Sequence, residues 1–179
     1  MLILLGCARP PEPNEPSPPV LDGAEVRWFE LEGVDRIDLL ESCLARCPRD
    51  EDGVAVASLT TWRLHWDWVR APTAPCTLAG ASVHAVVEVD LPRWVPPPEA
   101  DPALVAEWDE WHARLRWHEQ GHVDVVRGFT DAAEAKLVEA GCEGVEEEGA
   151  RLVAGLRAAQ LDYDRATANG HAQGARFWE

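Results

Sequence analysis

The segment WHEQGH places two histidines, His118 and His122, four residues apart, and Glu119 directly follows the first of them. In a helix, positions four apart lie one turn apart on the same side, so two imidazoles at this spacing can bind one zinc ion. The carboxylate of Glu119 would then act as general base toward a water that attacks a carbonyl. Together with a place on the apolar side of a long predicted helix that follows a sheet, the spacing favours a zinc-dependent hydrolase. The alternative is two half-buried histidines that are satisfied by hydrogen bonds.

The helix that carries this motif is predicted to begin at Asp101, an N-cap residue followed by Pro102 at the first helical position. Apolar side chains and both histidines then recur at three- and four-residue steps along one face: Leu104, Trp108, Trp111, Leu115, His118, His122 and Val126. The helix is expected to run to about Ala140, where Gly141 fits a stop. A second helix is predicted over residues 145–163, with Leu152, Leu156 and Leu161 turned inward.

Three segments before the motif helix are predicted to be strands: residues 24–33, 58–69 and 81–94. The second and third alternate between apolar and polar residues, as half-buried strands do, and Pro92 with the prolines at 96–98 is expected to end the third. A short helix with Ile37, Leu40 and Leu44 at helical spacing separates the first two. Strands followed by helices predict an α+β fold: a small antiparallel or mixed sheet, the long motif helix and a further C-terminal helix, in a zincin-like arrangement.

The N-terminus begins with an apolar run, Leu2 to Leu5, followed by Gly6 and Cys7. Leu-x-Gly-Cys resembles the lipobox of bacterial lipoproteins, in which the cysteine is lipidated. Only six residues precede Cys7, fewer than a signal peptide needs, so either the true start lies upstream or the match is accidental. We therefore divide the chain into a truncated signal (1–7), a proline-rich linker (8–23) and one folded domain (24–179).

The composition limits which partners the protein is expected to bind and in which compartment it is expected to lie. The formal net charge of -16 would repel a phosphate backbone, so nucleic acid is not an expected partner. Four cysteines remain once Cys7 is set aside, and Cys43–Cys47 with Cys76–Cys142 is the simplest of three possible pairings in an oxidising compartment. These features predict an exported protein of the cell envelope or one that is secreted.

Several segments together resemble a known family. The runs TTWRLHWDW, LPRW, WHEQGH and YDRATANGHAQGA are similar to a bacterial family, domain of unknown function 922, whose members are described as predicted secreted zinc-dependent proteases. The family's tail pattern is roughly Tyr-Asp-x-x-Thr-x-His-Gly-x-x-Gln-Gly. This chain matches it at Tyr163, Asp164, Thr167, Gly170, Gln173 and Gly174. It departs at Asn169, where the family has histidine.

A catalytic zinc needs about three protein ligands, and the third is left open by the sequence. If the family's tail histidine is a ligand, His171, two residues after Asn169, is the preferred replacement. Asn169 itself or a glutamate of the 143–148 cluster would be the alternatives, although the cluster also fits a solvated helix start. Tyr163 is expected to stabilise the oxyanion of a tetrahedral intermediate, or else to be an ordinary packed tyrosine.

The resulting prediction is a zinc-dependent peptide-bond hydrolase of the bacterial cell envelope that acts on a peptide or protein substrate. Zn²⁺ would be its cofactor, with ligands His118, His122 and His171, and Cys7 would carry a membrane anchor. The competing prediction is a noncatalytic envelope lipoprotein, whose zinc site is structural or degenerate and whose surface binds a partner. An intact Glu119 favours the enzyme, because a structural site needs no base.

Overall fold

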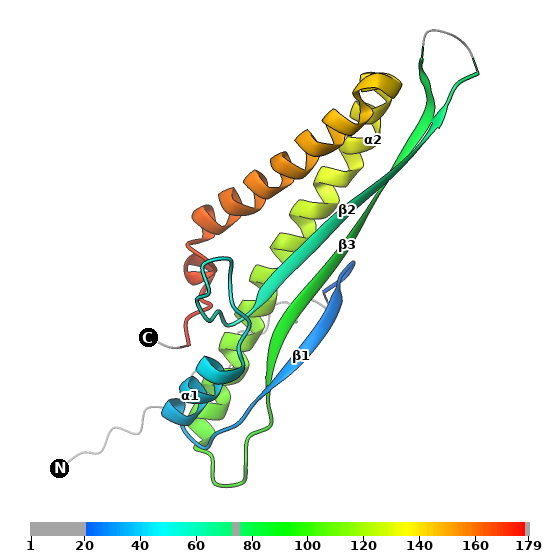
Figure 1. The fold of residues 1–179 in the computed structure, drawn as a ribbon. Coiled ribbons are helices and arrows are strands. Elements are labelled where there is room, and N and C mark those ends of the chain that lie inside the picture. The colour runs from blue at the N-terminus through cyan, green and yellow to red at the C-terminus, as the bar shows by residue number, and fades with distance from the viewer. Residues whose placement is uncertain (1–20, 73–75, 178–179) are drawn as a thin grey trace, which may run out of the picture.

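The computed structural model describes residues 21–72 and 76–177. In chain order they form β1 (Glu25–Leu31), α1 (Arg36–Arg46), β2 (Leu59–Arg70), β3 (Leu78–Trp94), α2 (Pro102–Thr167) and the short 3-10 helix η1 (His171–Gln173). The expected α+β architecture is confirmed, with strands first and the long helix after them (Figure 1). The proposed signal and most of the proline-rich linker, including Cys7, lie outside the described residues.

The sheet has three strands in the order β1-β3-β2 and is mixed. The central strand β3 pairs in parallel with β1 and antiparallel with β2. One face of the sheet packs on α2: Trp62 and Leu64 of β2 and Val87 and Val89 of β3 contribute to the same buried cluster as the helix. The expected alternation in β2 and β3 is therefore confirmed.

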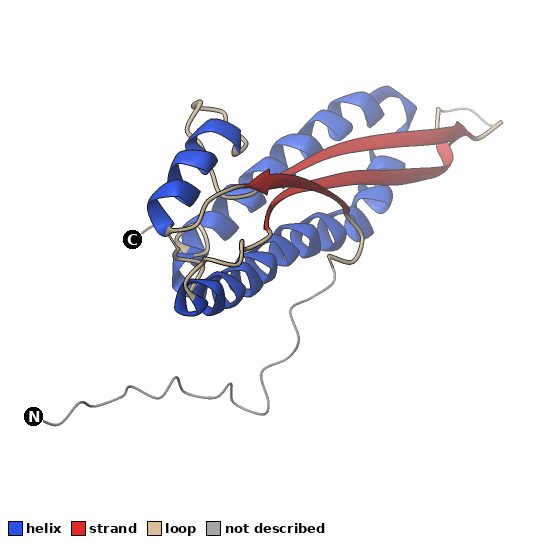
Figure 2. Cartoon of the chain, turned by 90° about the horizontal axis from the view of Figure 1, so that it is seen from below, coloured by secondary structure: helices blue, strands red, loops and turns tan. Residues whose placement is uncertain are grey.

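The helix α2 is a hairpin of two arms. Asp101 caps it by accepting a hydrogen bond from Ala103 N at 2.8 Å, as predicted. Gly141 has non-helical dihedrals of φ 68° and ψ 178°. There the chain turns, so that arm 142–167 runs back along arm 102–140 (Figures 1 and 2). Glycine adopts a positive φ at little cost, which explains why the first arm ends at Gly141, as predicted.

Both predicted disulfides are present. Cys76, just before β3, is bonded to Cys142, the residue after the bend of α2. Cys43 and Cys47 are bonded across the end of α1. The first of these bonds fixes the far end of the helical hairpin to the sheet.

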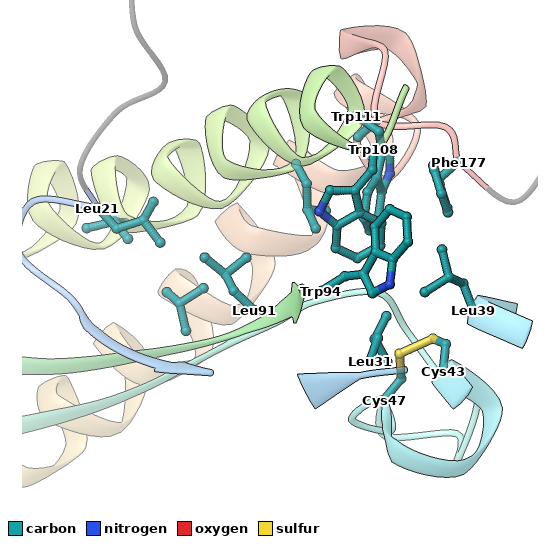
Figure 3. Packing of buried hydrophobic residues seen from close by; sticks show 14 of the residues in the cluster. Leu21, Leu31, Leu39, Cys43, Cys47, Leu91, Trp94, Trp108, Trp111 and Phe177 are labelled. Atoms are coloured by element: carbon teal, nitrogen blue, oxygen red, sulfur yellow. A yellow bond between two sulfur atoms is a disulfide. The ribbon is translucent and has the colours of Figure 1, made fainter. Parts of the chain in front are cut away.

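An aromatic core closes the opposite end of the molecule (Figure 3). Trp108 meets the rings of Trp94 and Phe177 edge to face at 5.4 and 5.3 Å, and the Cys43–Cys47 bond lies beside this group. Phe177 is only 1% exposed. Its burial returns the tail to the body of the fold and so holds η1 against α2.

Three details differ from the sequence prediction. β3 continues through Pro92 to Trp94; the pairing with β2 ends at Asp90, so at Pro92 only the β1 side of β3 is paired. Helix α1 forms where expected, but it buries Leu39 and Cys43, whereas Ile37 is 68% exposed. On the second arm, Leu161 is 52% exposed and its neighbour Gln160 is buried.

Candidate metal centre

Three side chains from the two arms of α2 bring their ligand atoms together. The Nε2 atoms of His118 and His122 are 3.2 Å apart. Oδ1 of Asp164 lies 3.1 Å from Nε2 of His122 and 3.5 Å from Nε2 of His118. Both histidines are less than a tenth exposed, while the Asp164 side chain is 31% exposed. Such a group could hold a metal ion.

Two glutamines orient the imidazole rings. Oε1 of Gln173 lies 2.9 Å from Nδ1 of His118, and Oε1 of Gln160 lies 2.5 Å from Nδ1 of His122. The Gln160 amide N–H donates to the backbone carbonyl of His122 at 3.1 Å, so its oxygen must face the ring. A carbonyl oxygen only accepts, and each Nδ1 therefore carries the proton. In a neutral ring that tautomer leaves the Nε2 lone pair free, and the Nε2 atoms of both rings lie beside the same Oδ1 atom of Asp164.

The charges of the group reinforce one another in the metal-free protein. Burial alone would raise the pKa of Asp164, but hydrogen bonds with His118 and His122 outweigh burial and hold that pKa well below its ordinary value. Burial alone would lower the pKa of His122, but the hydrogen bond to Asp164 and the negative charge of Glu119 raise it. The site thus favours positive charge between two carboxylates.

Tyr163 lies on the second arm, and its ring contacts the rings of both histidines. Its ring stacks on His118 with centroids 5.3 Å apart, and its hydroxyl donates to the backbone carbonyl of His118 at 3.1 Å. Nε2 of Gln173 donates to the same hydroxyl at 3.1 Å. A Cβ on Gly121 would lie 1.9 Å from this hydroxyl oxygen. The glycine inside WHEQGH is therefore what allows Tyr163 to approach the first arm.

Glu119 faces the start of β2. Ser58 Oγ and Thr60 Oγ1 each lie 2.5 Å from one of its carboxylate oxygens. Glu119 is only 3% exposed. The carboxylate therefore lies between arm 102–140 of α2 and the segment that leads into β2, with one hydroxyl donor on each oxygen.

His171 is exposed in η1 and does not belong to the group that holds His118 and His122. Gly170 has a left-handed φ of 81°, and a Cβ there would lie 3.1 Å from Cγ of His118. The tail thus meets His118 through Gly170 and Gln173. Asn169 is also exposed, and Glu147 and Glu148 pair with Arg151 on the second arm.

One protein family matches most of the chain. The family described as "Bacterial protein of unknown function (DUF922)" matches residues 26–172. The chain belongs to this family. The DUF922 match includes His118, His122 and Asp164, but the family description assigns no activity. No curated protein and no solved structure matches the chain.

No role in the site was predicted from the sequence for Asp164, Gln160, Ser58 or Thr60. One signal was available for the first two: Gln160 and Asp164 are four residues apart on the second arm, mirroring His118 and His122 on the first. Asp164 also falls in the tail pattern shared with the DUF922 family. Ser58 and Thr60 carry no such signal, because hydroxyl residues at a strand start are common.

The donor set fits zinc. Ligand atoms about 2.0–2.1 Å from a tetrahedral Zn²⁺ are about 3.3–3.4 Å from one another. The three separations of 3.1, 3.2 and 3.5 Å straddle that value. Two imidazole nitrogens and one carboxylate form a borderline-soft set that suits zinc better than Mg²⁺ or Ca²⁺, which prefer oxygen ligands.

Proposed function

We propose that this protein is a zinc-dependent hydrolase of peptide bonds in which His118, His122 and Asp164 hold the metal. The observation that carries the proposal is the convergence of three lone-pair donors at the spacing of a zinc tetrahedron, with a buried glutamate adjacent to the first ligand in sequence. Asp164 takes the place for which His171 was expected. Three protein ligands leave a fourth position open, as catalytic zinc sites do.

When bound, zinc would supply Lewis acidity that activates a water and polarises a substrate carbonyl. Glu119 is the residue that would accept the proton of the attacking water and pass it to the leaving amine. Gln160 and Gln173 keep both imidazoles in the tautomer that presents Nε2. The hydroxyl proton of Tyr163 is directed to the His118 carbonyl, so an oxyanion role for Tyr163 would require this hydrogen bond to break.

The metal assignment is tested by elemental analysis of purified protein. We expect about one zinc per chain in the wild type, and a large loss in His118→Ala, His122→Ala and Asp164→Ala, because two remaining ligands rarely retain zinc. His171→Ala is the matched control and should keep its zinc. Full zinc in Asp164→Ala together with loss in His171→Ala would restore His171 as the third ligand.

The reaction is tested by cleavage of a broad peptide library, with chelation and zinc add-back. Glu119→Gln should keep zinc but lose activity by about a hundredfold or more, since an amide cannot accept the proton. Equal cleavage by wild type and Glu119→Gln, each fully loaded with zinc, would remove the hydrolase assignment for those substrates.

One observation favours a second candidate, a noncatalytic binding module with a structural metal. Both oxygens of Glu119 already accept hydrogen bonds, from Ser58 and Thr60, and the metal ligands join two arms of one helix. In that case zinc would be stoichiometric, while Glu119→Gln would change neither metal content nor any hydrolysis. The two assays above therefore separate the candidates.

We also propose that the domain works in the cell envelope, tethered by lipid on Cys7 or secreted. The two disulfides support an oxidising compartment. Among the described residues, no helix is both long and apolar enough to cross a membrane. The protein should fractionate with membranes, and Cys7→Ser should release it. A wholly soluble wild type with an unmodified N-terminal peptide by mass spectrometry would contradict the anchor.

A further inference from the structure

The carboxylate of Glu119 is held by an element that does not belong to the metal-binding helix. Ser58, just before β2, and Thr60, at its start, each place a hydroxyl oxygen 2.5 Å from a different oxygen of Glu119. The two residues are separated only by Leu59, so one short segment that leads into β2 delivers both hydroxyls to one carboxylate. Both hydroxyls donate, Ser58 Oγ to Oε1 of Glu119 and Thr60 Oγ1 to Oε2.

This arrangement restricts Glu119 more than the helix alone can. A glutamate side chain has several rotatable bonds, each with more than one staggered rotamer, so the helix alone does not fix where its carboxylate lies. Two hydrogen bonds to two oxygens fix both the position and the plane of the group. A carboxylate offers about four lone-pair sites, so one site on each oxygen remains available for an incoming proton.

We propose that Ser58 and Thr60 are positioning residues that hold Glu119 in the orientation needed for proton transfer, an inference that rests on the proposed hydrolase function. They would touch neither substrate nor metal. Their contribution is to the geometry of the base, and a displacement of about 1 Å at such a group can cost on the order of a hundredfold in rate. The sheet thereby becomes part of the catalytic machinery through its edge strand.

The alternative is that the hydroxyls merely satisfy a buried charge. Buried carboxylates need hydrogen-bond partners for stability alone, and such a role would lower the melting temperature without changing turnover of the folded protein. The two roles are separable because one moves kcat and the other does not.

The experiment compares Ser58→Ala, Thr60→Val and their double variant with Thr60→Ser, which keeps the hydroxyl. Thr61→Val is the matched control, because Thr61 is the next residue on β2 and points to the opposite face. Zinc content, zinc affinity, kcat, KM and the melting temperature of the metal-free protein are measured for each. Thr60→Val is also combined with Glu119→Gln.

We expect kcat to fall on the order of tenfold in each single variant and a hundredfold in the double variant, with KM, zinc content and zinc affinity unchanged. Thr60→Ser should recover most of the turnover, and Thr61→Val should match the wild type. Thr60→Val should cost nothing further in kcat once Glu119→Gln is present. In the metal-free protein, the losses in melting temperature from Thr60→Val and Glu119→Gln should be non-additive, because the residues are in contact.

Unchanged kcat in the Ser58→Ala, Thr60→Val double variant, in a wild type that does cleave peptides, would overturn the positioning role and leave the proposed function intact. If the wild type cleaves nothing, the proposed function fails, and the positioning role falls with it. The melting temperatures then still report whether the hydroxyl pair is a structural contact of Glu119. Additive thermal losses would show that the contact itself is absent in solution.

Discussion

At the scale of single residues, the glycine of WHEQGH matters as much as its histidines. Gly121 lies where any side chain would collide with Tyr163, since a Cβ there would be 1.9 Å from the hydroxyl oxygen. Tyr163 cannot yield freely, because its ring stacks on His118 and its hydroxyl bridges the His118 carbonyl and Gln173. The absence of a side chain at Gly121 therefore sets how closely the second arm approaches the first.

Gly121→Ala should displace Tyr163 and loosen the ring of His118, and zinc affinity should fall about 10- to 100-fold, as for other losses of support around a metal ligand. Gly128→Ala is the control on the same arm: nothing lies within 4 Å of a Cβ there, so it should stabilise the helix by up to about 1 kcal/mol. Gly121→Ala should also lower the melting temperature, and adding Tyr163→Ala should recover part of that loss. Equal zinc titrations for both glycine variants would contradict this account.

The residues of the candidate site differ in how well they could be predicted from the sequence. His118, Glu119 and His122 could be predicted together because their relation is local: one helical turn fixes it. Asp164 could not, because its distance to His122 depends on where the chain bends at Gly141 and on how closely the arms pack. The hydroxyls of Ser58 and Thr60 depend in addition on the pairing of β2 with β3. Each missed residue lies across a tertiary contact from the motif.

At the scale of elements, the helical period of the sequence predicted where helices form better than it predicted which of their side chains are buried. The apolar face of the first arm of α2 is buried as expected, because a sheet and a second arm cover it. In α1, Ile37 and Leu44 follow a helical period but are 68% and 56% exposed, and the opposite side with Leu39 and Cys43 is buried. A short helix that is fixed by a disulfide and by the contact of Arg36 with the ring of Phe177 need not present its most apolar stripe to the core.

The Cys76–Cys142 bond should contribute stability without shaping the metal site. It closes a stretch with a sequence separation of 66, for which chain-entropy estimates give about 4 kcal/mol. Cys43–Cys47 spans only 4 residues and should contribute about 2 kcal/mol. Replacing both members of the longer bond with alanine should therefore lower the melting temperature by about 10 °C, more than the same change at the shorter bond.

Zinc affinity should remain close to that of the wild type in the Cys76→Ala, Cys142→Ala double variant. The bend at Gly141 is about 28 Å along the helix from His122, and the arms are held near the site by Gln160, Tyr163 and Asp164. Calorimetric titration with zinc measures this directly. A large loss of affinity would mean that the bend, rather than the contacts beside the site, sets the alignment of the arms.

At the scale of the whole molecule, the metal would join segments that are far apart in sequence. His118 and His122 come from the first arm of α2 and Asp164 from the second, while Gln173 brings in the tail that also contains the buried Phe177. Glu119 adds a contact with Thr60 at the start of β2. A ligand that binds only where these segments meet must stabilise the folded state, because the unfolded chain cannot present them together.

Zinc should therefore raise the melting temperature of the metal-free protein. At a free zinc concentration a thousandfold above the dissociation constant, linkage gives about 4 kcal/mol, or about 10 °C for a domain of this size. Asp164→Ala should lose most of that rise. Asp162→Ala should keep it, because Asp162 is an exposed residue two positions away that pairs with Arg165 on the surface. Mg²⁺ should give little rise, since it prefers oxygen ligands in octahedral geometry. Differential scanning calorimetry across a zinc series makes the comparison, and an equal rise in Asp164→Ala and Asp162→Ala would show that zinc binds without joining the two arms.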